Sequence, residues 1–249
     1  MFLNKLDEAI KNYDLAISQA PKAKFYIEKG RIFNKQGKNN EEIQTYLEGL
    51  EKSHKDSFYL ELTKITGNYY YARTKEFDKS INIYKKGIEN FPEDYILYEK
   101  LIKALNASNK FDEANEYFEH TRKLYQEKKL SDDYMKYKNI AVDEFEWNGQ
   151  WINIFKSFEK PKEILDSLYK VYLIDKSGKK IERKFNIEKT IKIEKKDPEF
   201  VVCEELNNGH NTYPIGLKDE TFKLSELRQI IVSILNKKQK EAATIRFNQ

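Results

Sequence analysis

The 249-residue sequence contains a single cysteine, Cys203, and only nine glycines and five prolines. One cysteine excludes an internal disulfide framework and a zinc site built from several thiolates. The few glycines and prolines indicate long regular elements, because these two residues dominate turns and loops. No run of 18 apolar residues occurs, and residues 1–12 lack the apolar segment of a signal peptide. We therefore expect a cytoplasmic protein that does not enter a membrane.

An excess of charge of one sign is also missing. Lysines and arginines number 45 and aspartates and glutamates 41, which leaves a formal net charge of +4. Such a balance argues against binding of nucleic acid or of a membrane surface by charge alone. Aromatic residues are plentiful by contrast, with 17 tyrosines and 15 phenylalanines. They supply enough large apolar surface for a folded core.

In the first half of the chain, a small residue recurs four positions before an aromatic residue. The pairs are Ala9 and Tyr13, Ser80 and Tyr84, and Ala114 and Phe118, and in a fourth copy Glu42 takes the place of the small residue before Tyr46. Positions four apart share one face of a helix, so the small residue lets a neighbouring helix approach and the aromatic ring fills the adjacent gap. The first members stand at positions 9, 42, 80 and 114, at intervals of 33, 38 and 34 residues. A recurrence near 34 residues predicts an array of stacked helical hairpins.

This pattern resembles the tetratricopeptide repeat (TPR) family over residues 1–127. The resemblance implies paired antiparallel helices that stack into a right-handed superhelix. Glu42 departs from it by occupying a normally small position, and His54 stands where a proline is usual. The 38-residue interval is too long by about four residues, from which we expect an extended helix or a longer turn. Gly30 and Gly67 are expected where two backbones nearly touch.

The first small residue, Ala9, marks the second helix of a repeat, so the sequence opens with half a repeat. The end of a helical array without a polar cap exposes the apolar face that a neighbouring repeat would bury. We therefore expect residues 2–18 to self-associate or to bind a partner.

After residue 138 the spacing changes to the alternation of strands. Residues 140–155 form two alternating runs joined by Asn148 and Gly149, a strong signal for a hairpin. The register of this hairpin predicts that Phe145 faces Ile152 and that Val142 faces Phe155.

Further elements follow from the same reasoning. Strands are predicted at residues 168–175, 180–187, 190–194 and 200–206, with another Asn-Gly turn at residues 208–209. A short helix is expected at residues 130–138. A helix after Ser225 carries an apolar stripe made of Leu224, Leu227, Ile230, Ile231, Ile234 and Leu235.

The expected fold class is therefore α + β with two domains. Residues 1–138 would form an α-solenoid of TPR-like helix pairs with a closing helix. Residues 139–249 would form an antiparallel β-sheet of about six or seven strands with a C-terminal helix. No family resemblance is recognised in this second half.

The TPR resemblance implies a function as well, because the first helix of each repeat in that family lines a concave groove that holds a peptide or protein. Carried over in register, the groove residues are Lys24, Ile27, Arg31, Lys35, Glu61, Lys64, Asn68, Tyr71, Ile96, Glu99 and Lys103. The set is net basic, so we expect an acidic or mixed partner segment with aromatic or aliphatic anchors. Lys64 and Asn68 also match one repeat of the family's clamp for a C-terminal carboxylate. Ile27 and Arg31 do not match it, and we interpret the match as chance.

Residue patterns for catalysis, metal binding or cofactor binding are not recognisable. The histidines His54, His120 and His210 are scattered, and no phosphate-binding glycine loop or nucleophile motif occurs. We therefore predict a non-enzymatic adaptor that binds a protein or peptide, with no catalytic, metal or cofactor residues.

Two alternatives stay open. The β-rich half could be an unrecognised enzyme or small-ligand domain, with a pocket around Cys203, His210 and Tyr213. RNA binding is suggested by lysines interleaved with the tyrosines of residues 69–71, and it requires exposed rings on which bases can stack.

Overall fold

The computed structural model describes residues 2–53, 57–131, 138–148, 150–159, 169–174, 180–191, 198–206 and 209–216, and also Arg228, Val232 and Asn236. Its contacts divide the chain into two compact units, which are described separately. The first unit is Met1–Ser108 with Lys129–Ser131, and the second is Asn109–Lys128 with Asp132–Gln249. The domain boundary expected between residues 138 and 139 stays a prediction.

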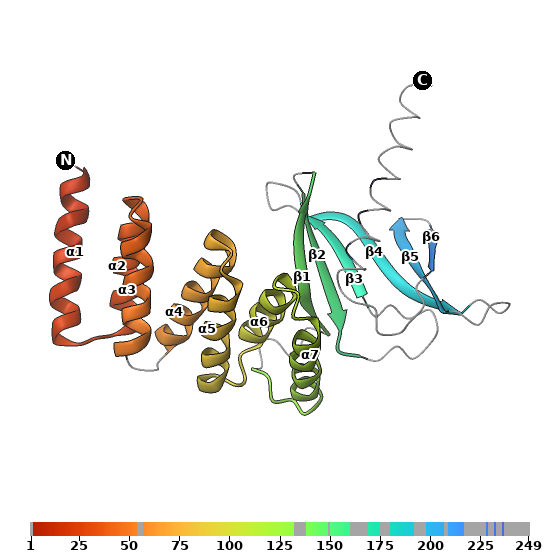
Figure 1. Cartoon of the computed structure of the whole chain (residues 1–249), viewed down its shortest axis with the longest axis horizontal. Coiled ribbons are helices and arrows are strands. Elements are labelled where there is room, and N and C mark those ends of the chain that lie inside the picture. Colours follow the sequence, from red (N-terminus) through yellow and green to blue (C-terminus); the bar gives the residue numbers. More distant parts are fainter. Residues whose placement is uncertain are drawn as a thin grey trace, which may run out of the picture. The chain divides into compact units, whose positions relative to one another are not determined.

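The first unit consists of helices (Figure 1). They are α1 (Phe2–Gln19), α2 (Ala23–Lys35), α3 (Asn39–Lys52), α4 (Ser57–Asn68), the π-helix η1 (Tyr69–Thr74), α5 (Phe77–Asn90) and α6 (Tyr95–Ala107). Helices that follow one another in the sequence pack side by side, and α2 also contacts α4. The predicted array of helical hairpins is thus present in this unit.

Two glycine–tyrosine contacts hold the hairpins of this unit together. A Cβ atom at Gly30 would lie 2.1 Å from Cε1 of Tyr46, and one at Gly67 would lie 2.2 Å from Cε1 of Tyr84. Both glycines and both tyrosines are buried. The prediction that two backbones nearly touch at these glycines is wrong, because a tyrosine ring occupies the space that each glycine leaves.

The long interval of the repeat has a structural cause. Helix α4 continues without a break into η1, where the Lys75 amide donates to the carbonyl of Tyr70, five residues earlier. Lys75 then ends the helix in the left-handed conformation, at φ 58°. An extended helix, one of the two predicted options, therefore accounts for the extra residues.

Helix α1 is packed less deeply than the others. Its small and aromatic positions, Ala9 and Tyr13, are only half-buried, and Leu15 is 60% exposed. The Tyr13 ring lies 6.4 Å from the ring of Phe25 in α2. Self-association through this helix stays a prediction. Of the helices in the described part of the chain, none combines the length and the apolar character needed to cross a bilayer.

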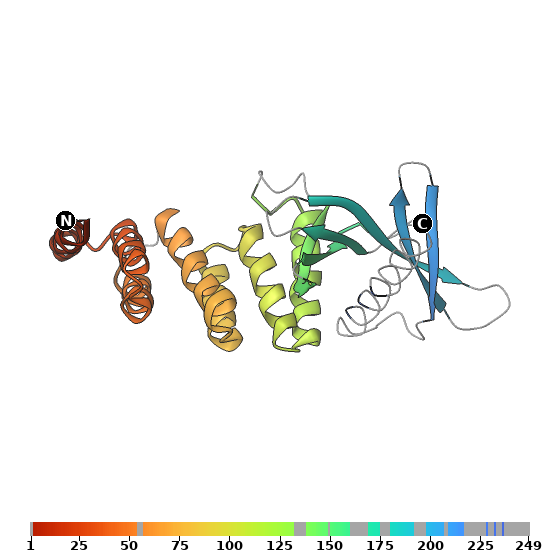
Figure 2. The ribbon, with the colours of Figure 1, turned by 90° about the horizontal axis from the view of Figure 1, so that it is seen from above.

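The second unit combines one described helix, α7 (Phe111–Gln126), with an antiparallel sheet (Figure 2). The strands are β1 (Asn139–Trp147), β2 (Gln150–Ser157), β3 (Tyr169–Ile174), β4 (Lys180–Ile191), β5 (Pro198–Leu206) and β6 (Gly209–Gly216). They lie in sequence order across the sheet, each antiparallel to the next. Of the separate strand predicted at residues 190–194, Thr190 and Ile191 belong to β4, and the other residues lie outside the described part of the chain. Most of the short helix predicted at residues 130–138 lies outside the described residues.

The register of the first hairpin is partly as predicted. Phe145 pairs with Ile152, but Val142 does not pair with Phe155, whose partner is Ala141. The register shifts between Ala141 and Asp143, so Val142 is the extra residue of a β-bulge. One inserted residue breaks the alternation of the strand, and Asp143 as well as Val142 is buried.

The second unit packs around Phe158, which is fully buried at the end of β2. Its ring stacks on Phe118 at 5.9 Å and on Tyr125 at 5.0 Å, both from α7. Arg122 of the same helix donates to the Ser157 carbonyl at 3.2 Å.

Two residues of the predicted C-terminal helix contact β1. Arg228 forms a paired hydrogen bond with Asp143, and Asn236 accepts a hydrogen bond from the Trp147 indole at 3.2 Å. Arg228, Val232 and Asn236 are helical and lie at a spacing of four, on one face of a helix. The apolar stripe of this helix lies outside the described residues.

Candidate functional site in the helical unit

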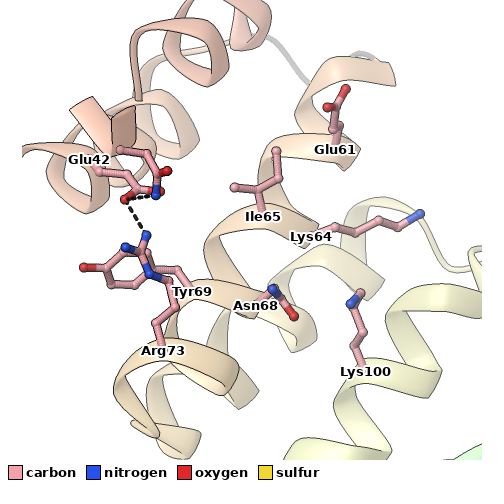
Figure 3. A pocket seen from close by; sticks show the side chains of 9 residues that line it. Glu42, Glu61, Lys64, Ile65, Asn68, Tyr69, Arg73 and Lys100 are labelled. Atoms are coloured by element: carbon pink, nitrogen blue, oxygen red, sulfur yellow. Dashed lines mark hydrogen bonds and ion pairs between the residues drawn. The ribbon is translucent and has the colours of Figure 1, made fainter. Parts of the chain in front are cut away.

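A cavity of about 400 Å³ opens in the first unit and is drawn in Figure 3. We call it the groove pocket. Its lining residues are Asn34 of α2, Glu42 of α3, Glu61, Lys64, Ile65 and Asn68 of α4, Tyr69 and Arg73 of η1, and Lys100 of α6.

Helix α4 forms the bottom and one wall of the groove pocket. Glu61, Lys64, Ile65 and Asn68 are spaced by three or four residues, which places them on one face of this helix. Ile65 packs against the buried core and supplies an apolar surface. Figure 3 shows Lys100 of α6 on the same side of the pocket as Lys64 and Asn68.

Lys64 is held in place by the acidic residue that precedes α6. Its Nζ atom lies 2.7 Å from Oδ2 of Asp94, and Asp94 is mostly buried. The other oxygen of Asp94 accepts the Leu97 amide at 2.9 Å and caps the N-terminus of α6. The same carboxylate thus positions both the lysine and the helix that carries Lys100.

The opposite wall centres on Glu42. Its Oε2 atom accepts hydrogen bonds from Nδ2 of Asn34 at 2.9 Å and from Nη1 of Arg73 at 2.5 Å, drawn as dashed lines in Figure 3. The Glu42 side chain is 6% exposed and that of Arg73 is 40% exposed. A buried carboxylate therefore meets a guanidinium whose outer edge faces the pocket.

Arg73 is fixed by two further contacts. Its Nη2 atom donates to Oδ1 of Asn39 at 2.9 Å, and its guanidinium lies over the Tyr69 ring at 4.9 Å. The Tyr69 hydroxyl donates to the Asn39 carbonyl at 3.0 Å. The arginine thus lies in one defined orientation, which suits it to planar recognition of a carboxylate.

The environment of this wall also acts on Tyr46. Burial raises the pKa of the Tyr46 phenol, and the charge of Glu42 and a hydrogen bond with it raise that pKa further. These surroundings disfavour the phenolate form of Tyr46.

The structure brings three of the predicted groove residues together in the pocket, namely Glu61, Lys64 and Asn68. Arg31 lies beside them without lining the cavity, and it pairs with Glu28 at 2.5 Å and with Glu61 at 2.8 Å. Of the five cations expected to make the groove basic, Arg31 and Lys64 each have an acidic partner.

The other predicted groove residues lie elsewhere. Ile27 is 1% exposed and belongs to the core, and Lys24 lies over the Phe58 ring at 5.2 Å. Tyr71 is half-buried, with its ring 5.6 Å from that of Phe77. The remaining members, outside the pocket lining, are Lys35 at the end of α2 and Ile96, Glu99 and Lys103 on α6. On α6 the lining residue is Lys100, one position from the predicted Glu99.

Six lining residues were not predicted from the sequence: Asn34, Glu42, Ile65, Tyr69, Arg73 and Lys100. Glu42 carried a signal, because it breaks the small-residue pattern of the repeat. Tyr69 and Arg73 carried one too, because they lie in the segment that makes the 38-residue interval long. Asn34 and Lys100 carried no signal.

The three consecutive tyrosines are part of the helix packing. Tyr69 and Tyr70 are buried, with Arg73 over the first ring and Lys79 over the second at 5.2 Å. Lys75 lies 5.8 Å from the Tyr71 ring. Stacking of bases needs exposed ring faces, so the two buried rings do not favour the RNA-binding alternative.

The enzyme alternative depends on Cys203, His210 and Tyr213, for which only the strand backbone is described. Cys203 pairs with Thr212, His210 with Glu205 and Tyr213 with Val202, all between β5 and β6. No side-chain geometry in the described part of the chain bears on this alternative, which stays a prediction.

Comparisons with known proteins add little to these observations. No protein-family model matches the chain, and the search of curated proteins also found no match. Among solved structures, one described as "Crystal structure of MamA protein" matches with 19% sequence identity and a TM-score of 0.39. The match covers 51% of this chain and 69% of that one. A likeness at this level carries no argument about function.

Proposed function

We propose that the first unit is a protein-interaction module of the TPR type, and that a segment of a partner protein binds across α2, α4 and α6 with one side chain in the groove pocket. The groove pocket is the observation that supports this proposal. It combines an apolar bottom at Ile65 with polar groups held in fixed positions around it. Binding sites for anchor side chains have this composition.

The energy of such binding must come mainly from the apolar anchor. Arg31 with Glu61 and Lys64 with Asp94 are already paired within the chain. A partner's charge would have to compete with these pairs, and exposed pairs each contribute only about 0.2–1 kcal/mol. In this proposal the protein is a non-enzymatic adaptor whose second unit binds another protein or positions the helical unit.

Site-specific photocrosslinking in the full chain tests the proposal. We would place p-benzoylphenylalanine at Asn68, which lines the groove pocket, and in a separate variant at Asn82, an exposed asparagine on α5. The expected result is a protein adduct from position 68 that position 82 does not give. The crosslinking is carried out in cells of the natural source. Identical adducts from both positions, or no adduct from position 68, would contradict the proposal.

A blocking variant provides the matched control. Asn68→Trp fills the pocket with an indole, whereas Asn82→Trp adds the same group to an exposed face of α5. Once the crosslinked partner is known, N68W should weaken its binding at least tenfold, and N82W should leave binding unchanged.

A further inference from the structure

Glu42 stands where the repeat otherwise places a small residue. It lies four residues before Tyr46, which packs on Gly30, just as Ser80 lies four residues before Tyr84, which packs on Gly67. At the equivalent positions of α1 and α7 the residue is alanine, Ala9 and Ala114. An acidic side chain in such a buried position needs a reason, because burial of a carboxylate is costly unless the carboxylate is paired.

One partner of Glu42 comes from outside the repeat pattern. Arg73 belongs to η1, the π-helical extension that makes the interval between Glu42 and Ser80 longer than the others. A π-helical turn often marks a functional position in a helix. The two departures from the repeat, the acidic residue and the long helix, thus meet in one ion pair on the wall of the groove pocket.

The groups around the Glu42 carboxylate constitute a site for a carboxylate. Asn34 and Arg73 each donate a hydrogen bond to Oε2 of Glu42. Asn39 and the Tyr69 ring orient the guanidinium of Arg73. The site that these groups form is buried on the side of Glu42. Donors fixed in this way bind a planar anion whether it belongs to the chain or to another molecule.

We propose that Asn34 and Arg73 form a carboxylate-binding site that the chain fills with its own Glu42, so that the partner group facing this wall is uncharged. This inference rests on the proposed function, because it describes what the groove pocket selects. An acidic side chain of a partner would have to displace a carboxylate that is covalently held in place. A basic side chain would face the guanidinium of Arg73. A neutral anchor on Ile65 meets neither obstacle.

Removing the internal carboxylate tests the inference without any partner. In Glu42→Ala, which restores the residue type of Ala9 and Ala114, the site should accept propionate as an external ligand. Helicity at 222 nm in the full chain would be followed on heating, with propionate, with its neutral isostere propionamide, and with sodium chloride at matched ionic strength. At ten times its Kd, propionate should raise the Tm of E42A by roughly 5 °C.

The signal of the Arg73 Nε–H group in NMR reports the binding directly. In E42A this signal should shift saturably with propionate, with an affinity at least tenfold higher than that for propionamide. Wild type should show no saturable shift with either compound. The double variant E42A/R73M should lose both the thermal and the spectroscopic response.

Each outcome decides the matter. A saturable response to propionate in wild type, or an unchanged response in E42A/R73M, would overturn the inference, and so would no response in E42A. If E42A is unfolded in buffer, propionate must refold it, and failure to do so counts against the site. A negative result leaves the proposed function standing, because the crosslinks from position 68 do not depend on Glu42.

Discussion

The hairpins α2–α3 and α4–η1–α5 share one contact and differ in another. In both, a tyrosine of the second helix packs on a glycine of the first. One turn before the tyrosine, Ser80 is enclosed within its own hairpin, where its hydroxyl donates to the Gly67 carbonyl at 2.9 Å. Glu42 instead bonds to Asn34 in its own hairpin and to Arg73 in the next one. At this position of the repeat, Ser80 therefore bonds within its own hairpin, whereas Glu42 links its hairpin to the next one.

This difference shows how a repeat acquires a specific site. The glycine–tyrosine contact sets the spacing of the helices and is the same in both hairpins. The acidic residue of the first hairpin pairs with an arginine that η1 of the second hairpin supplies. The difference between the two hairpins can be tested by exchanging the residues at this position or by removing one partner at a time. Helicity at 222 nm reports mainly on the helices, and both tryptophans of the chain lie in β1 and β2 and report on the second unit.

The largest effect is expected when an acidic residue is placed at the equivalent position of the second hairpin, where Ser80 bonds to the Gly67 carbonyl and not to an arginine. Ser80→Glu buries a carboxylate at a position that is fully buried. An uncompensated buried charge destabilises by about 3–5 kcal/mol. Urea denaturation at 222 nm would measure the loss, with Asn82→Glu on the exposed face of α5 as the control. Equal stability of S80E and N82E would show that the two hairpins do not differ in this way.

Removal of Arg73 should have the next largest effect. Arg73→Met leaves Glu42 buried without its cation and should cost about 1–3 kcal/mol. Arg31 is a matched control, because it is similarly exposed but pairs with Glu61, whose side chain is 42% exposed. Arg31→Met should cost less than about 1 kcal/mol. In an E42A background the cost of R73M should vanish, and an equal cost in both backgrounds would refute a coupling between the two residues.

Filling a glycine should have a somewhat smaller effect. A methyl group at Gly67 would overlap the Tyr84 ring, and such overpacking costs about 1–3 kcal/mol. Alanine gains about 1 kcal/mol over glycine in helix propensity, so the net loss for Gly67→Ala is expected at about 0–2 kcal/mol. Asn68→Ala, at the exposed next position, is the control.

The Tyr84→Ala background tells overlap from backbone effects. There the ring is gone, and Gly67→Ala should become neutral or stabilising. If Gly67→Ala lowers the stability equally with and without the Tyr84→Ala substitution, the loss does not come from overlap with the Tyr84 ring.

The parts of the fold that could be predicted from the sequence are those set by short-range spacing. Ser80 and Tyr84, or Gly30 and Gly67, repeat because each helix must offer the same surface to its neighbour. The Asn148 turn likewise fixes the pairing of Phe145 with Ile152 within a few residues. Such patterns are visible without any knowledge of the rest of the chain.

The parts that could not be predicted depend on residues far apart. Arg73 pairs with Glu42 across 31 positions, and Arg228 pairs with Asp143 across 85. The bulge at Val142 lies within an apolar run, where nothing in the sequence marks an extra residue. The assignment of groove residues taken from the family is wrong at Ile27, because this side chain is buried in the core.

The smallest expected effect concerns a half-buried cation in the second unit, Lys156, which contrasts with Arg73. Its Nζ atom donates to Asn115 at 2.9 Å and lies 4.0 Å from the centre of the Phe118 ring. Burial lowers the pKa of Lys156 to about 8, with Arg122 lowering it further and Glu119 opposing the shift. Arg73, in contrast, pairs with a carboxylate, that of Glu42.

Because the pKa of Lys156 is lower in the folded state, the unfolded chain binds more protons between about pH 8 and its unfolded value near 10.4. Stability of the second unit should therefore rise as the pH increases through this window, by less than about 1.4 kcal/mol per pH unit. Urea denaturation followed by tryptophan fluorescence at pH 7.5, 8.5 and 9.5 measures this rise. Lys156→Met should flatten it, whereas Lys123→Met, at an exposed position of α7, should not. A rise that persists in K156M would assign the titration to another group and remove the contrast with Arg73.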